Sequence, residues 1–103
     1  MRKVKILVGK NQAGFLEEID PGKKYVFRYD KDYSGSPVSM TMPITQQEYT
    51  FDVFPPYFDG VLPEGVMLEA LLKQRKLDRT DLFGQLIAVG HDLVGAVSVE
   101  DIV

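Results

Sequence analysis

Residues 56–99 read PYFDGVLPEGVMLEALLKQRKLDRTDLFGQLIAVGHDLVGAVSV, and the spacing of the apolar side chains changes within this stretch. Apolar residues first recur every three to four positions, which predicts a helix over 66–76. A second apolar stripe predicts another helix, whose cap is Asp78 or Thr80 and whose end is marked by Gly90. The second half of the chain is therefore expected to carry two helices.

The rest of the chain has the period of β-strands. Apolar and polar side chains alternate over residues 3–8, 15–19, 25–29, 38–42, 49–53 and 93–99. Short turns, one of them expected at 11–14, leave no room for the crossover connections that parallel strands need. We therefore predict an α+β fold with a small antiparallel, barrel-like sheet of about five to six strands and two helices in the C-terminal half. The last strand is expected to pair back with the first half and to be required for folding.

The composition is that of a single small globular domain over residues 1–103. Hydrophobic residues make up 45% of the chain and charged residues 26%, so the chain as a whole is not expected to be disordered. The formal net charge of −3 argues against nucleic-acid binding by this chain alone. Cysteine is absent, and the apolar run near the N-terminus is too short for a signal sequence or a membrane span. We expect a cytoplasmic protein.

The sequence lacks the motifs of common catalytic sites. The single histidine, His91, lies between Gly90 and Asp92 in an expected turn, and there is no second histidine to share a metal ion. Neither GxGxxG nor GxxxxGKS/T occurs, and the HRD and DFG motifs of protein kinases are absent. We therefore expect no catalytic residue, no cofactor and no metal site, and His91 is expected to be a surface residue of the turn.

Residues 54–65, FPPYFDGVLPEG, carry more apolar surface than a connecting loop requires, and three prolines restrict their backbone. Such a segment either packs into its own core or contacts a partner. Phe54, Phe58 and Leu62 are expected to belong to the core, where they cover one end of the sheet. The candidate partner-binding residues are Asp59, Pro63, Glu64, Gly65, Val66 and Met67. A flexible methionine beside an aliphatic side chain is suited to a contact surface.

The order of three motifs, YFDGVLPEG, DLFGQLIAVG and DLVGAVSV, resembles the N-terminal subdomain of the HipA family of bacterial toxin kinases. The strand-like PVSMTMPI lies where that family has a similar alternating segment. In full-length family members a kinase domain follows this subdomain, and its functional residues have no matching positions here. The resemblance therefore implies the fold, a small sheet with helices packed against it, and a location against the N-terminal lobe of a kinase.

The resemblance further implies a function as a partner rather than as a kinase. In three-gene systems of the HipBST type the subdomain is encoded separately as the HipS antitoxin. The expectation is an antitoxin that binds and inhibits a HipT-like serine/threonine kinase toxin, with a HipB-like helix-turn-helix DNA-binding protein as a further partner. The alternative is a non-inhibitory structural subunit, or a fragment, that completes a HipA-like toxin kinase. A third reading is a small enzyme built on this scaffold.

Overall fold

The computed structural model describes residues 2–93 and 95–102. The elements in chain order are β1 (Arg2–Val8), β2 (Asn11–Asp20), β3 (Lys24–Tyr29), β4 (Glu48–Phe51), α1 (Pro56–Gly60), α2 (Gly65–Arg75), α3 (Leu82–Val89), the short 3-10 helix η1 (Gly90–Asp92) and β5 (Val97–Asp101).

The five strands form one antiparallel sheet in the order β4-β3-β2-β1-β5. The last strand pairs with the first, with Val99 opposite Ile6, so the two ends of the chain meet in neighbouring strands. The predicted α+β class and the antiparallel sheet are confirmed. The sheet is open rather than barrel-like, because β4 and β5 lie at opposite edges.

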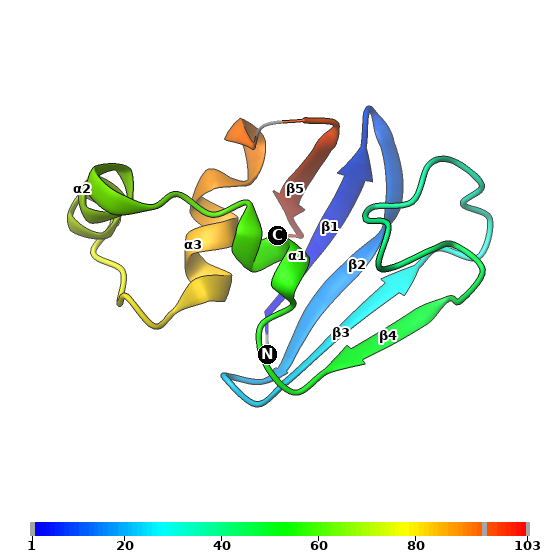
Figure 1. The fold of residues 1–103 in the computed structure, drawn as a ribbon, viewed down its shortest axis with the longest axis horizontal. Coiled ribbons are helices and arrows are strands. Elements are labelled where there is room, and N and C mark those ends of the chain that lie inside the picture. The colour runs from blue at the N-terminus through cyan, green and yellow to red at the C-terminus, as the bar shows by residue number, and fades with distance from the viewer. Residues whose placement is uncertain (1, 94, 103) are drawn as a thin grey trace.

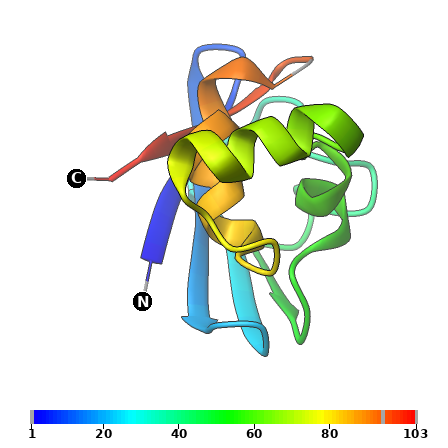
Figure 2. The ribbon, with the colours of Figure 1, turned by 90° about the vertical axis from the view of Figure 1, so that its left-hand side faces the viewer.

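The helices cover one face of the sheet in two layers. Helices α1 and α3 lie next to the strands, and α2 lies outside them as the outermost element (Figures 1 and 2). The buried core between sheet and helices includes Val4, Ile6, Leu16, Phe27, Phe58, Phe83, Leu86 and Val99. The same layering explains why α1 and α3 contribute buried residues whereas α2 contributes none.

Two segments differ from the sequence-based expectation in type. Residues 38–42 were expected to form a strand but make a tight turn, closed by an isolated bridge between Ser39 and Met42. The alternation of apolar residues reflects this turn, because Val38 and Met42 point into the core while Met40 points outward. Residues 56–60 form a helix instead of a loop, so residues 2–93 and 95–102 contain three α-helices rather than two.

Other elements are present but shifted. The turn expected at 11–14 is made by Gly9 and Lys10, because Gly9 adopts a φ of +64° that a tight turn requires, and β2 starts at Asn11. The final strand begins at Val97 rather than at 93, and residue 94 of the expected strand lies outside the described residues. Among the described residues, no helix has both the length and the apolar character needed to cross a membrane.

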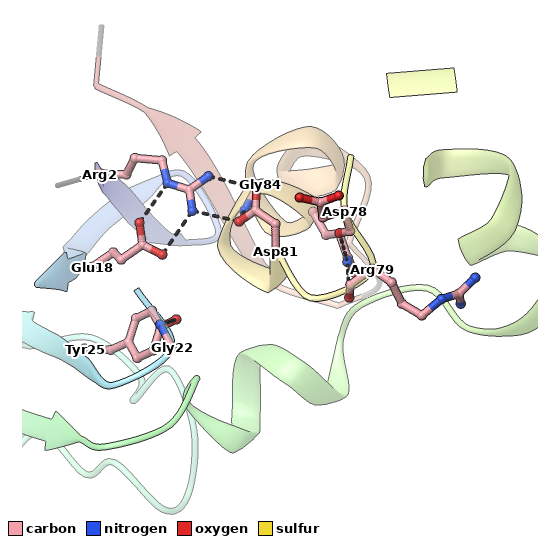
Figure 3. A network of polar contacts seen from close by, with 9 residues as sticks. Arg2, Glu18, Gly22, Tyr25, Asp78, Arg79, Asp81 and Gly84 are labelled. Carbon is pink, nitrogen blue, oxygen red and sulfur yellow. Dashed lines mark hydrogen bonds and ion pairs between the residues drawn. The ribbon is translucent and has the colours of Figure 1, made fainter. Parts of the chain in front are cut away.

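Helix α3 is held on the sheet by a network of charged side chains (Figure 3). Arg2 donates from Nε to Glu18 Oε1 over 2.9 Å and from Nη2 to Asp81 Oδ1 over 2.7 Å. Asp81 is also the helix cap, because its Oδ1 accepts the Gly84 N–H over 3.0 Å. The predicted cap at Asp78 or Thr80 is therefore wrong. Asp81 is selected because it alone satisfies both the helix end and Arg2.

Candidate partner-binding site

The chain enters the site through a short, restrained helix. Pro55 precedes α1, and Pro56 occupies its first turn, where the missing N–H of proline has no helical partner to lose. Phe58 of α1 is completely buried, and Phe54 and Leu62 on either side of the helix are also buried. These three residues belong to the core, as predicted. They fix the segment on which the candidate site is built.

A sharp turn connects this anchor to α2. Glu64 has an extended backbone, and Gly65 follows with a φ of +59° as α2 begins. Space around Gly65 is open, yet a side chain there is strained because this φ is in the left-handed region. The chain changes direction at this turn, and α2 therefore projects away from the sheet (Figure 1).

Helix α2 leaves most of its surface in contact with solvent. Leu68, Leu71 and Leu72 are half-buried and form the side that faces the rest of the fold. In the first turn, by contrast, the exposed fraction is 85% for Val66 and 71% for Met67. Two adjacent apolar side chains at this level of exposure are not stabilised by burial within the domain. They are available for contact with another molecule.

A groove of about 370 Å³ opens beside Met67. It lies between the turn that leads into α2 and the segment that follows α3, and its lining residues are Val61, Leu62, Pro63, Glu64, Met67, Val89, Asp92 and Leu93. The structure thus brings together Pro63, Glu64 and Met67 of the predicted site, with Gly65 and Val66 in the adjoining turn. Asp59 is exposed on α1 but does not line the groove.

Val61 and Leu62 line the groove without having been predicted as site residues, although they belong to the segment that was singled out. Three further lining residues, Val89, Asp92 and Leu93, lie in a part of the chain that the sequence did not connect with the site. Val89 ends α3, Asp92 ends η1 and Leu93 follows η1, and the fold returns this segment to the start of α2. The only signal in the sequence was the pair of apolar residues flanking Gly90-His91-Asp92, and that pattern also fits an ordinary turn. His91 itself is exposed, in agreement with its interpretation as a surface residue.

The charges are distributed unevenly along α2. Acidic Glu64 and Asp92 border the groove, whereas exposed Lys73, Arg75 and Lys76 lie at the other end of the helix. Both groups are favourable for the helix dipole. The site offers apolar surface with an acidic border, and within residues 2–93 and 95–102 no three His, Cys, Asp or Glu side chains cluster as metal ligands do. Its geometry is suited to binding a protein surface.

Comparison with known proteins places the chain in a family. The model of the HipA N-terminal domain family matches residues 4–100, which is nearly the whole chain. The chain belongs to the HipA N-terminal domain family. An uncharacterized protein from Haemophilus influenzae is 31% identical over 101 residues, covering 98% of this chain and 93% of the relative.

A solved structure of the HipA N-terminal domain family has the same fold. It is described as the N-terminal domain of HipA toxin, and it superposes with a TM-score of 0.78 at 28% sequence identity. The match covers 100% of this chain and 94% of that chain. The overall fold of this chain is therefore that of a HipA N-terminal domain.

Proposed function

We propose that this HipA N-terminal domain protein is a non-enzymatic, HipS-type antitoxin that binds a HipT-like serine/threonine kinase toxin and inhibits it. The observation that carries the proposal is the exposed pair Val66 and Met67 at the start of α2, beside an apolar groove. A domain that is part of a toxin in a related protein has a surface suited to that toxin's other parts. When the domain is a separate chain, the same surface is available for binding between chains.

The physical basis for binding is that the apolar contact residues are preorganised before the partner binds. Pro63 and the buried Leu62 restrain the turn, so little conformational entropy is lost when Val66 and Met67 become ordered against a partner. Burying a Val or Met side chain contributes about 1.5 to 3 kcal/mol. Two such side chains are sufficient for a small hot spot, and the acidic border of Glu64 and Asp92 favours a partner surface with basic residues around its pocket.

The competing function is that of a structural subunit that completes a HipA-like toxin kinase without inhibiting it. One observation favours it: the matched solved structure is described as a domain of a toxin. The two functions predict opposite effects on the kinase. An antitoxin lowers phosphorylation, and a completing subunit preserves or raises it.

The deciding experiment measures kinase activity as this chain is added. A HipT-like kinase, sought among the genes next to this one, is purified, and its phosphorylation of itself or of a substrate protein is followed with radiolabelled ATP at increasing concentrations of the chain. Antitoxin function predicts that phosphorylation falls and is abolished near one chain per kinase. Unchanged or increased phosphorylation with demonstrable binding would establish the structural subunit instead.

The proposal includes a HipB-like helix-turn-helix protein as a further partner and a cytoplasmic location, with no direct contact of this chain to nucleic acid or membrane. Co-expression of the three proteins with a tag on the helix-turn-helix protein tests the assembly. Recovery of this chain only when the kinase is present supports an arrangement in which the kinase is the shared partner. Recovery without the kinase contradicts that arrangement.

A further inference from the structure

Helix α2 is the least firmly held helix of the fold. It is the outermost element (Figures 1 and 2), and none of its residues is buried, whereas α1 and α3 each contribute buried side chains. Its inner side consists of the half-buried Leu68, Leu71 and Leu72. Most of the stability of a helix in a protein comes from the burial of its apolar face, and α2 has little of it.

Hollows lie at both ends of the contact between α2 and α3. At the first turn of α2, the groove of about 370 Å³ is lined by Met67 of α2 and by Val89 of α3. At the last turn, a hollow of about 270 Å³ is lined by Arg75 of α2 and by Ile87 and Ala88 of α3. Side chains beside a hollow lack the dispersion contacts of a close-packed interface. The contact of α2 with α3 is therefore loose at both ends.

The C-terminal end of α2 adds strain and only a weak polar contact. Lys76, which ends the helix, has a φ of +54° and is the only non-glycine residue with a positive φ in residues 2–93 and 95–102. Its Cβ makes this conformation unfavourable, and unwinding of the helix end relieves the strain. Arg79 Nη1 lies 2.6 Å from Glu69 Oε2, but both side chains are largely exposed, so water screens the pair.

Separation of α2 from α3 is expected to unwind the helix. Helix α2 has 11 residues, and isolated helices shorter than about 12 to 15 residues are marginal in water. The rest of the domain has its own support. Phe83 and Leu86 of α3 are completely buried, and Arg2 binds Asp81 at the start of α3 without any contribution from α2. Such a division allows one segment to open locally while the core stays folded.

We propose that α2 is a detachable segment, which separates from α3 and unwinds as one unit while the sheet and α3 stay folded, and which a partner in the groove beside Met67 holds in place. The role of the partner rests on the proposed function. The groove is lined by Met67 of α2 and by Val89 and Leu93 of the rest of the domain, so an occupant contacts both parts. Binding to the closed form alone lowers the population of the open form.

Native-state hydrogen exchange of the isolated chain, followed by NMR at urea concentrations below the unfolding transition, tests the detachment. After correction for intrinsic rates, the hydrogen-bonded amides of α2 are expected to exchange at least about 100-fold faster than those of β1 and α3, with one common urea dependence. Exchange of α2 as slow as that of α3 would overturn the proposal, because α2 would then open only when the whole domain unfolds. Protection that rises steeply from the ends of α2 to its middle would overturn it too, because that pattern is fraying.

Two variants are expected to shift the opening in opposite directions. Lys76→Gly removes the strain and is expected to slow the exchange of α2 about threefold. Glu69→Gln removes the ion pair with Arg79 and is expected to speed the exchange about twofold. Glu48→Gln is the matched control, because it removes another exposed ion pair, with Arg28, and is expected to leave α2 unchanged. Equal acceleration by both Gln variants would overturn the proposal, because exchange of α2 would then follow the stability of the whole domain.

Hydrogen exchange measured by mass spectrometry with a saturating HipT-like kinase tests the role of the partner. The kinase is expected to slow the exchange of α2 at least about tenfold. Unchanged exchange of α2 in the complex would overturn the claim that the partner holds α2 in place. A kinase that does not bind the chain would contradict the proposed function, whereas the detachment of α2 is decided by the isolated chain.

Discussion

Arg2 in β1 and Asp81 at the start of α3 form an ion pair in which Nη2 and Oδ1 are 2.7 Å apart. The same guanidinium binds Glu18 of β2, whose side chain is only 5% exposed, and lies 5.2 Å from the centre of the Phe83 ring. One arginine therefore joins two strands to the helix against which α2 packs. The position of the candidate site depends on the contacts of Arg2, although Arg2 and the site lie far apart in the sequence.

We expect Asp81→Ala to lower the free energy of unfolding by about 2 kcal/mol, because it removes both the helix cap and a partner of Arg2. Asp81→Asn retains a cap acceptor for the Gly84 N–H and loses only the charge, so its cost is expected to be about half as large. Urea unfolding followed by circular dichroism measures both. Equal losses for the two variants would mean that the charge, and not the cap, accounts for the contribution.

The contribution of Asp81 is expected to depend on pH. Hydrogen bonding from Arg2, opposed in part by burial and assisted by the Gly84 N–H, holds the pKa of Asp81 below its ordinary value. Because the pKa is lower in the folded state, the stabilisation is complete above the unfolded-state pKa of about 3.9 and is lost as pH falls through the folded-state pKa. The stability difference between the parent and Asp81→Asn should therefore shrink below about pH 4. A difference that stays constant from pH 7 to about pH 3 would contradict this linkage.

The sequence was a good guide where a local pattern had one structural solution. The apolar stripes of α2 and α3 and the alternation in β1 and β3 each appear in the structure close to the predicted bounds. The exposure of Val66 and Met67 and the burial of Phe54, Phe58 and Leu62 also followed from the sequence. In these cases the side-chain pattern and the tertiary packing favour the same structure.

The sequence was a poor guide where tertiary contacts selected among local solutions. Residues 38–42 alternate like a strand, but hydrogen bonds with Tyr29, whose hydroxyl accepts the Val38 N–H and donates to the Met42 carbonyl, hold them as a turn. The α3 cap required knowledge of Arg2, and the groove required η1 to return to the start of α2. No property of residues 89–93 read alone distinguishes that arrangement from an ordinary turn.

Tyr29→Phe tests whether the two hydrogen bonds of the Tyr29 hydroxyl hold the loop between β3 and β4 in place. The substitution removes one hydroxyl and leaves the buried Val38 N–H and the Met42 carbonyl without their partner. We expect a loss of about 1 to 3 kcal/mol in the free energy of unfolding. Tyr49→Phe is the matched control, because its hydroxyl bond to Pro43 is exposed and water can replace it. Equal effects of the two variants, measured by urea unfolding, would show that the loop does not depend on Tyr29.

Removal of β5 is expected to abolish the fold. A chain ending at residue 96 lacks the buried Val97 and Val99. It also leaves β1 unpaired along the edge that bonds β5, where the fully buried Ile6 lies opposite Val99. Each buried valine contributes about 1.5 to 3 kcal/mol, and together they are comparable with the stability of a small domain. A chain ending at residue 101 retains β5 and is expected to unfold cooperatively on heating. A similar cooperative transition in the shorter chain would show that β5 is peripheral.

The partner-binding surface is tested by Val66→Asp combined with Met67→Asp. Both side chains are largely exposed, so the double variant is expected to fold, while two carboxylates would have to lose water on entering an apolar pocket of the kinase. We expect kinase affinity to fall at least about 100-fold, which corresponds to roughly 3 kcal/mol. Calorimetry measures the affinity, and circular dichroism verifies the fold.

The matched control for this surface is Gln74→Asp combined with Thr80→Asp, which adds the same charge at exposed positions away from the groove. Its affinity for the kinase is expected to stay within about threefold of the parent, because exposed charges at a distance interact weakly. A folded Val66 and Met67 double variant that inhibits the kinase as well as the parent does would locate the binding surface elsewhere. If that variant unfolds while the control folds, Val66 and Met67 support the domain itself, and their exposure in the isolated chain does not reflect a role in binding.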